Sequence, residues 1–173
     1  MSSRVTPWFD RRFDLTFPLE QAPDIIARLR GTPERLEDIL RGVSREILIR
    51  RRHEQWSPQE HAGHLLDLES LWITRVNDYV RAAPALTAAD LTNRKTHEAN
   101  HNARELNDLL HGFRDARRTL LEALIELPTD VLDRRLSHPR LRQSMRLVDH
   151  LYFAAEHDDH HLATIRELIT TAD

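Results

Sequence analysis

The sequence predicts an all-α protein, a four-helix bundle with a long connection between the second and third helices. Apolar residues recur at the spacing of one helix face in four long stretches, as in the helices of a bundle. No window alternates apolar and polar residues as a strand would, and no Asn-Gly or Asp-Gly turn predicts a hairpin. With 173 residues, the chain has the length of one domain. We expect an N-terminal arm over residues 1–18 and a single domain over residues 19–173.

The arm and the first helix are separated near Leu19. Aromatic residues of the arm stand among charges and prolines, which favours a segment laid over the core. From Leu19 the apolar spacing becomes helical, but Gly31-Thr32-Pro33 interrupts it. Thr32 before Pro33 is typical of an N-cap followed by proline at the first helical position, so we predict two helical segments joined by a kink.

The second helix has the most clearly marked start. Ser57-Pro58-Gln59-Glu60 is a capping box with proline at its first position, and apolar residues follow on one face until Pro84. Residues 83–101 then form a polar connection, with one helical turn expected at Thr87 to Leu91. Because connections of this length in a compact domain are usually functional or mobile, we expect a lid.

The last two helices are predicted from their apolar stripes and terminators. The third runs from about Asn102 to Leu127, where Pro128 ends it. The fourth covers roughly Gln143 to Ile169.

Composition excludes several classes of function. Without cysteine there is no disulfide, iron–sulfur cluster or cysteine nucleophile, and four isolated glycines cannot form a phosphate-binding loop. The 25 basic and 28 acidic residues lack the basic surplus of a nucleic-acid-binding protein, and no run of 18 apolar residues could span a membrane. The N-terminus lacks the apolar core of a secretory signal, so we expect a cytoplasmic protein.

The 11 histidines carry the main functional signal. His157 and His161 lie four apart on the predicted fourth helix, where Cβ atoms are about 5–6 Å apart. Both nitrogens can therefore reach one metal ion at about 2.0–2.1 Å. His64, at the edge of the apolar stripe of the second helix, is the best third ligand. Three imidazoles would leave a coordination position open, as in catalytic sites.

Nearby carboxylates are candidates for orienting these histidines. A ligating histidine commonly donates its second N–H to a carboxylate, and four acidic residues lie close to the three histidines in the sequence. These candidate acceptors are Glu60, Asp67, Glu156 and Asp158.

Two other interpretations remain open. A His-x-x-x-His pair can arise by chance in so histidine-rich a chain, and its rings would then simply be hydrogen-bonded. His97-Glu98-Ala99-Asn100-His101 also matches the zincin motif His-Glu-x-x-His. That match falls where a polar loop meets a helix start, and Arg104 and Asn107 stand where a metzincin needs Gly and His.

Two segments resemble the hallmark segments of the DinB-like (YfiT-like) superfamily: Trp56-Ser-Pro-Gln-Glu-His-Ala-Gly-His64 and His157-Asp-Asp-His-His161-Leu-Ala-Thr-Ile165. The resemblance spans about residues 20–170. It implies a four-helix bundle holding a divalent metal, often nickel or zinc, on His64, His157 and His161. Members are described as metal-dependent hydrolases or as transferases for low-molecular-weight thiols, and many are dimers. Thr164 stands where the family often has Gln.

We therefore expect a metalloprotein whose open coordination position takes water or a thiol, with Glu60 or His61 as the candidates for proton transfer. The expected partners are a small-molecule substrate, including a low-molecular-weight thiol, and a second copy of the chain in a homodimer. The alternative is a non-catalytic metal-binding or stress-response module whose histidines sense metal or pH.

Overall fold

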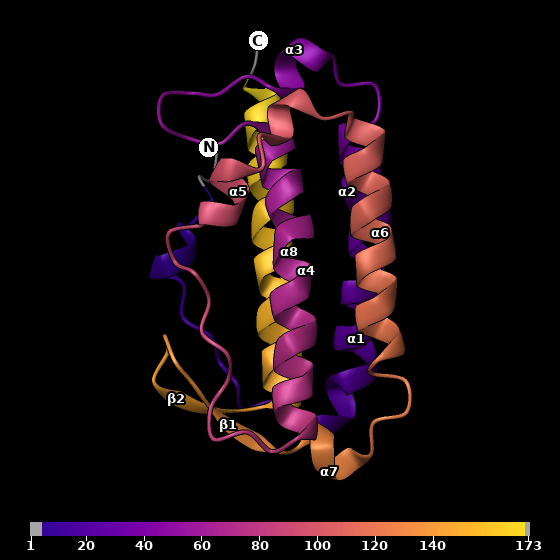
Figure 1. Cartoon of the computed structure of the whole chain (residues 1–173), viewed down its shortest axis with the longest axis vertical. Coiled ribbons are helices and arrows are strands. Elements are labelled where there is room, and N and C mark those ends of the chain that lie inside the picture. Colours follow the sequence, from indigo (N-terminus) through magenta and orange to yellow (C-terminus); the bar gives the residue numbers. More distant parts are fainter. Residues whose placement is uncertain (1–4, 172–173) are drawn as a thin grey trace.

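The computed structural model describes residues 5–171, and they form a bundle of helices (Figure 1). Its long helices are α4 (Pro58–Val80), α6 (Leu106–Glu122) and α8 (Leu147–Thr170). The shorter α1 (Ala22–Arg30) and α2 (Thr32–Leu40) follow one another along α6 and α8. Helix α4 packs against both α6 and α8. The prediction of a mainly helical chain is confirmed.

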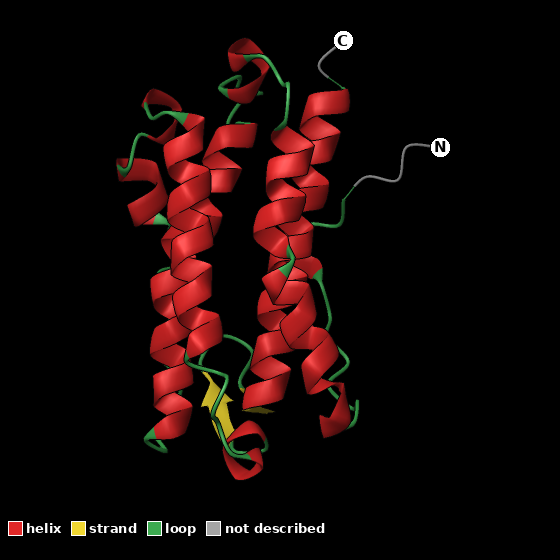
Figure 2. Cartoon of the chain, turned by 90° about the vertical axis from the view of Figure 1, so that its right-hand side faces the viewer, coloured by secondary structure: helices red, strands yellow, loops and turns green. Residues whose placement is uncertain are grey.

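Short elements connect and cover these helices (Figure 2). They are the 3-10 turns η1 (Trp8–Asp10), η2 (Leu19–Gln21) and η3 (His101–Ala103), and the helices α3 (Arg45–Leu48), α5 (Arg94–Glu98) and α7 (Thr129–Leu132). Among the helices within residues 5–171, none combines the length and the apolar character needed to cross a membrane.

The break between α1 and α2 confirms the two predicted segments but not the predicted cap. Gly31 is the N-cap of α2, and Thr32 is already its first residue. Thr32 points its hydroxyl into the bundle instead, where it donates to Asp158 Oδ2 at 2.8 Å. The N-cap assignment of Thr32 was wrong because its hydroxyl has a buried partner on another helix.

The start of α4 is as predicted. The Ser57 hydroxyl accepts from the Glu60 N–H at 3.1 Å, and Glu60 Oε2 accepts from the Ser57 N–H at 2.9 Å. The helix ends at Val80, four residues before Pro84.

The connection after α4 contains a helix, but not at Thr87 to Leu91. Asp90 accepts from the Thr92 and Arg94 N–H groups, at 2.9 and 3.1 Å, and so forms the turn that precedes α5. The third long helix begins later than predicted, at Leu106, because Arg104 is extended after η3.

The all-α prediction is wrong for residues 135–146. Arg135–His138 (β1) and Gln143–Arg146 (β2) form an antiparallel hairpin in which Leu136 pairs with Met145. The predicted start of the fourth helix at Gln143 is a strand, and α8 begins at Leu147. Four-residue strands are too short to show a clear alternation of apolar and polar residues. In β1 the alternation is further obscured because one of the two buried positions is occupied by a polar residue, His138. Arg142, with φ 51°, supplies the turn conformation in place of glycine.

Two groups of buried apolar side chains fill the bundle. One lies among α1, α4, α8 and the hairpin, and arm residues Trp8, Phe13 and Phe17 pack against it. The other lies among α2, α4, α6 and the end of α8, around Leu36 and Phe113. Residues 5–18 of the predicted arm cover the core beside α8, and its residues 1–4 lie outside the described part of the chain.

Candidate metal centre

Three histidines from two packed helices converge on one point. His64 of α4 and His157 and His161 of α8 each offer one ring nitrogen, and the three nitrogens lie within 4.8 Å of one another. The Nε2 atoms of His157 and His161 are 3.1 Å apart. In a tetrahedral zinc site, ligand nitrogens about 2.0–2.1 Å from the ion are roughly 3.3 Å from each other. The two α8 rings are thus already at ligand spacing.

The hydrogen bonds of His64 leave the correct nitrogen free. Its Nδ1 lies 2.9 Å from Thr96 Oγ1, and the Thr96 hydroxyl donates to Asp67 Oδ2 at 2.9 Å. Because that hydroxyl has one hydrogen, it must accept from His64 Nδ1–H, which leaves Nε2 unprotonated. A carboxylate thus fixes the His64 tautomer through a hydroxyl, as carboxylates do around bound metals. Asp67 was among the predicted acceptors; Thr96 was not foreseen.

His101 completes the surroundings of Asp67. Its Nε2 donates to Asp67 Oδ2 at 2.8 Å. Burial would raise the pKa of Asp67, but the hydrogen bonds from His101 and Thr96 lower it, so the carboxylate is charged. A Cβ at Gly63 would lie 2.2 Å from His101 Cγ, so only glycine allows the His101 ring to pack this closely on α4. The sequence showed no signal for this contact.

His61 stands behind His161. The two Nδ1 atoms are 2.8 Å apart, within hydrogen-bond distance. In the tautomer in which His161 Nδ1–H donates to His61, Nε2 of His161 is unprotonated and can bind a metal. Burial lowers the pKa of His61 to about 3 and that of His64 to about 4. Burial also holds the pKa values of His157 and His161 well below 6.5. All four rings are neutral at pH 7, as metal ligands must be.

Glu60 lies away from this centre. Its carboxylate closes the capping box of α4 and pairs with Arg51, and it does not line the cavity described below. Burial would raise its pKa, but the hydrogen bond from Arg51 lowers it. Of the two residues predicted for proton transfer, only His61 is brought to the three histidines.

Two of the predicted carboxylate acceptors face elsewhere. Glu156 pairs with Arg28 at 2.7 Å, and Asp158 pairs with Arg117 at 2.7 Å. Neither orients a histidine of the centre, because cations from other helices hold both.

The structure also separates the two histidines of the zincin match. His97 is exposed at the end of α5, and Asn100, with φ 47°, breaks the chain direction before His101. His101 Nε2 is bound to Asp67. The motif therefore does not lie on one helix, and the zincin interpretation is wrong.

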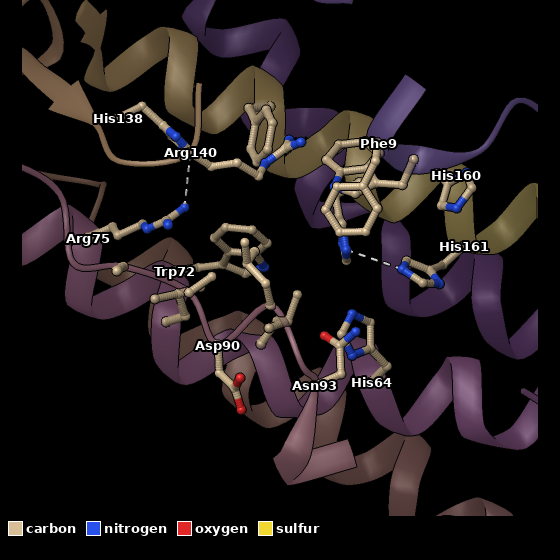
Figure 3. Close-up of a pocket in the computed structure, with 18 of the residues that line it drawn as sticks. Phe9, His64, Trp72, Arg75, Asp90, Asn93, His138, Arg140, His160 and His161 are labelled. Atoms are coloured by element: carbon tan, nitrogen blue, oxygen red, sulfur yellow. Dashed lines mark hydrogen bonds between the residues drawn. The ribbon is translucent and has the colours of Figure 1, made fainter. Parts of the chain in front are cut away.

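The three histidines open into a cavity of about 500 Å³ (Figure 3). The predicted lid forms one wall, although only its residues 88–91 and 93 contribute, and the arm and the hairpin loop form others. Most of the lining is apolar or aromatic. The lining side chains outside the centre include Trp8, Phe9, Trp56, Leu68, Leu71, Trp72, Leu91, Phe153 and His160.

A family and two solved structures are similar to this chain in sequence or fold. The DinB superfamily matches residues 28–165. The fold is similar to that of YfiT from Bacillus subtilis, described as a probable metal-dependent hydrolase with an unusual four-helix bundle topology. That likeness has a TM-score of 0.81 and 19% identity and covers 93% of each chain.

A second similar structure is the mycothiol-dependent maleylpyruvate isomerase, with a TM-score of 0.66 and 12% identity over 91% of this chain and 62% of that one. No curated protein sequence matches significantly. The family match covers more than half of the sequence. The chain therefore belongs to the DinB superfamily.

Proposed function

We propose that the protein is a metal-dependent enzyme built on a four-helix bundle in which α1 and α2 together form the first helix. His64, His157 and His161 hold one divalent transition metal ion, nickel or zinc. One observation carries this proposal: three neutral imidazoles meet at the wall of a cavity, and no fourth protein ligand joins them among residues 5–171. A structural site would be closed by a fourth protein ligand, whereas an open position serves catalysis.

The residues around the centre position its ligands. Asp67, acting through Thr96, fixes the ring of His64, and His61 fixes the ring of His161. A pKa of about 3 makes His61 a poor general base at neutral pH, so orientation of His161 is the role that its chemistry favours. A divalent ion held by the three rings would supply Lewis acidity toward a water or thiol entering from the cavity.

The cavity supports a small organic molecule as substrate. Its volume of about 500 Å³ lies within the usual range of ligand sites, and its walls are mainly apolar. The two proposed reactions are hydrolysis and transfer to a low-molecular-weight thiol. Since the chain contains no cysteine, any thiol must come with the substrates. The proposal includes a homodimer, which light scattering of the purified protein would test.

Metal analysis of matched variants tests the proposal. We expect about one equivalent of nickel or zinc per chain in the purified protein and almost none in His157→Ala. His97→Ala, which changes an exposed histidine outside the centre, should keep the full equivalent. Metal retained by His157→Ala, or lost from His97→Ala, would contradict the proposal. An enzyme should also lose hydrolase or thiol-transferase activity with a chelator and regain it when metal is restored, whereas a purely sensory module would show neither activity.

A further inference from the structure

Two arginines line the cavity together with His138. Arg75 comes from α4 and is 2% exposed, and Arg140 comes from the loop of the hairpin. Figure 3 shows Arg75 and His138 on one side of Trp72, with His64 and His161 on the other. No carboxylate within residues 5–171 forms an ion pair with either arginine. Asp90, the one acidic residue of the lining, accepts from backbone N–H groups of its own turn.

His138 adds another donor beside Arg75. The Leu141 N–H donates to His138 Nδ1 at 3.2 Å, so Nδ1 is the unprotonated nitrogen and Nε2 carries the hydrogen. Burial lowers the pKa of His138 to about 4, so the ring is neutral at pH 7. Its Nε2–H lies 3.4 Å from Arg75 Nη1, which is also a donor. Two donors facing each other call for a shared acceptor.

Arg140 is held in place without an acceptor. Its guanidinium carbon lies 5.2 to 5.9 Å from the ring centroids of Trp8, Phe9 and Phe153, positions suited to cation–π contact. Its Nη2 is buried without a hydrogen-bond partner. Burial lowers the pKa of Arg75 only to about 10, and arginine stays charged in proteins. Arg75 Nε donates to the Thr87 carbonyl at 2.9 Å, but that oxygen carries no full charge. A buried cation without a counter-ion is costly, and an anion would remove that cost.

We propose that Arg75, His138 and Arg140 bind an anionic group of the substrate, such as a carboxylate. This inference rests on the proposed function, since it places the reacting group of that substrate at the three histidines. His64 and Arg75 are eleven residues apart on α4, and a rise of 1.5 Å per residue separates their Cα atoms by about 16 Å. Leu68, Leu71 and Trp72 line the space between them. The substrate is therefore an elongated, largely apolar acid.

A pair of matched probes tests this assignment. 4-Phenylbutyrate and its neutral amide, 4-phenylbutanamide, have almost the same shape and differ in charge. Calorimetric titration of the purified protein should show at least about tenfold tighter binding of the acid, the size of effect expected for charge-assisted hydrogen bonds. Arg140→Gln should abolish this preference. Arg142→Gln, which removes an exposed charge from the same loop, should retain it. Equal or undetectable binding of the two probes to the unmodified protein would overturn the proposal.

The His157→Ala variant separates this proposal from the metal centre. If the acid binds at the arginine end, the preference persists in His157→Ala and is lost in Arg140→Gln. If the acid binds at the three histidines, the preference is lost in His157→Ala and persists in Arg140→Gln, which overturns the inference. A protein without metal that still prefers the acid, and loses the preference in Arg140→Gln, would contradict the proposed function alone.

Discussion

Consecutive residues of α8 face two different buried polar regions. Asp158 points toward α2 and α6, where Arg117 donates to its Oδ2 at 2.7 Å and also pairs with Glu69 at 2.6 Å. His157 lines the cavity, where its Nε2 lies 3.1 Å from His161 Nε2, and its other ring nitrogen, Nδ1, has no hydrogen-bond partner. Charges of opposite sign meet on the first side. On the cavity side, Arg75 donates to the Thr87 carbonyl at 2.9 Å, and no carboxylate within residues 5–171 forms an ion pair with Arg75 or Arg140.

On the paired side, ion pairs to Arg117 hold the helices together, and Asp158 Oδ1 is the one atom of Arg117, Glu69 and Asp158 that is buried without a partner. The unpartnered groups on the cavity side are candidates for binding a ligand. Buried polar atoms are normally hydrogen-bonded, so each exception requires an explanation. Several of the exceptions line the cavity: His157 Nδ1, His160 Nδ1, Trp72 Nε1 and Arg140 Nη2. On the paired side, burial raises the pKa of Glu69 to about 7 although Arg117 opposes the shift. Arg117 therefore offsets the energetic cost of burying the carboxylates of Glu69 and Asp158.

The largest effect should come from removing the cation on the paired side. Arg117→Met leaves Glu69 and Asp158 buried without their partner, and we expect a loss of about 3–5 kcal/mol in the free energy of unfolding. Urea denaturation measures it. Arg118→Ala changes the exposed neighbour and should cost less than about 0.5 kcal/mol. Equal stability of the two variants would show that the buried network does not stabilise the fold.

On the cavity side, substitutions should affect metal affinity more than folding. Thr96→Val keeps the shape of the side chain but removes the hydroxyl between His64 and Asp67. We expect metal affinity to fall about 10- to 100-fold, as measured by competition with a chelator. Thr119→Val, an exposed threonine of α6, is the matched control and should not change affinity. Unchanged affinity in Thr96→Val would mean that the hydroxyl does not orient His64.

A smaller loss of stability should follow from filling the space at Gly63. Alanine normally favours a helix over glycine by about 1 kcal/mol, but a Cβ here would overlap His101. We expect Gly63→Ala to cost about 1–2 kcal/mol in thermal or urea unfolding. Gly112→Ala, whose Cβ would meet only Leu66 at 3.3 Å, should change stability by less than about 1 kcal/mol. If Gly63→Ala were stabilising, His101 could not be packed as described.

The smallest effect concerns pH. His138 has a pKa near 4 in the folded protein and about 6.5 when unfolded. Between pH 6.5 and 4, His138 therefore binds more protons in the unfolded chain than in the folded protein. The stability that the neutral ring contributes is present above pH 6.5 and is lost as pH falls through 4. Between pH 7.5 and 5, His138→Gln should lose less stability than the unmodified protein, by on the order of 1 kcal/mol. His111→Gln, at an exposed site, should match the unmodified protein.

The sequence predicted those features that depend on local spacing. The capping box at Ser57 and the shared helix face of His157 and His161 depend only on residue spacing within one helix, which can be read from the sequence. Choosing His64 as their companion required only its place at the edge of an apolar stripe. The mainly helical fold followed from the same periodicity.

The rest depends on contacts between distant segments. The hairpin at residues 135–146 is too short to show a pattern, and Thr96 and His101 reach Asp67 from a connection that reads as polar loop. The zincin match was misleading because Asn100, between its two histidines, has a positive φ. The anion subsite could not be predicted either, because Arg75 and Arg140 line one cavity only when the hairpin folds beside α4.

Helix α4 carries a member of each end of the cavity, His64 and Arg75, on one uninterrupted run of backbone hydrogen bonds. Helix α4 thus fixes the distance between His64 and Arg75. If the acid binds as proposed, its length, rather than the chemistry of the walls, would decide whether its reactive end reaches the imidazoles. Binding of a homologous series of acids that differ by single methylene groups would therefore show which length matches that distance.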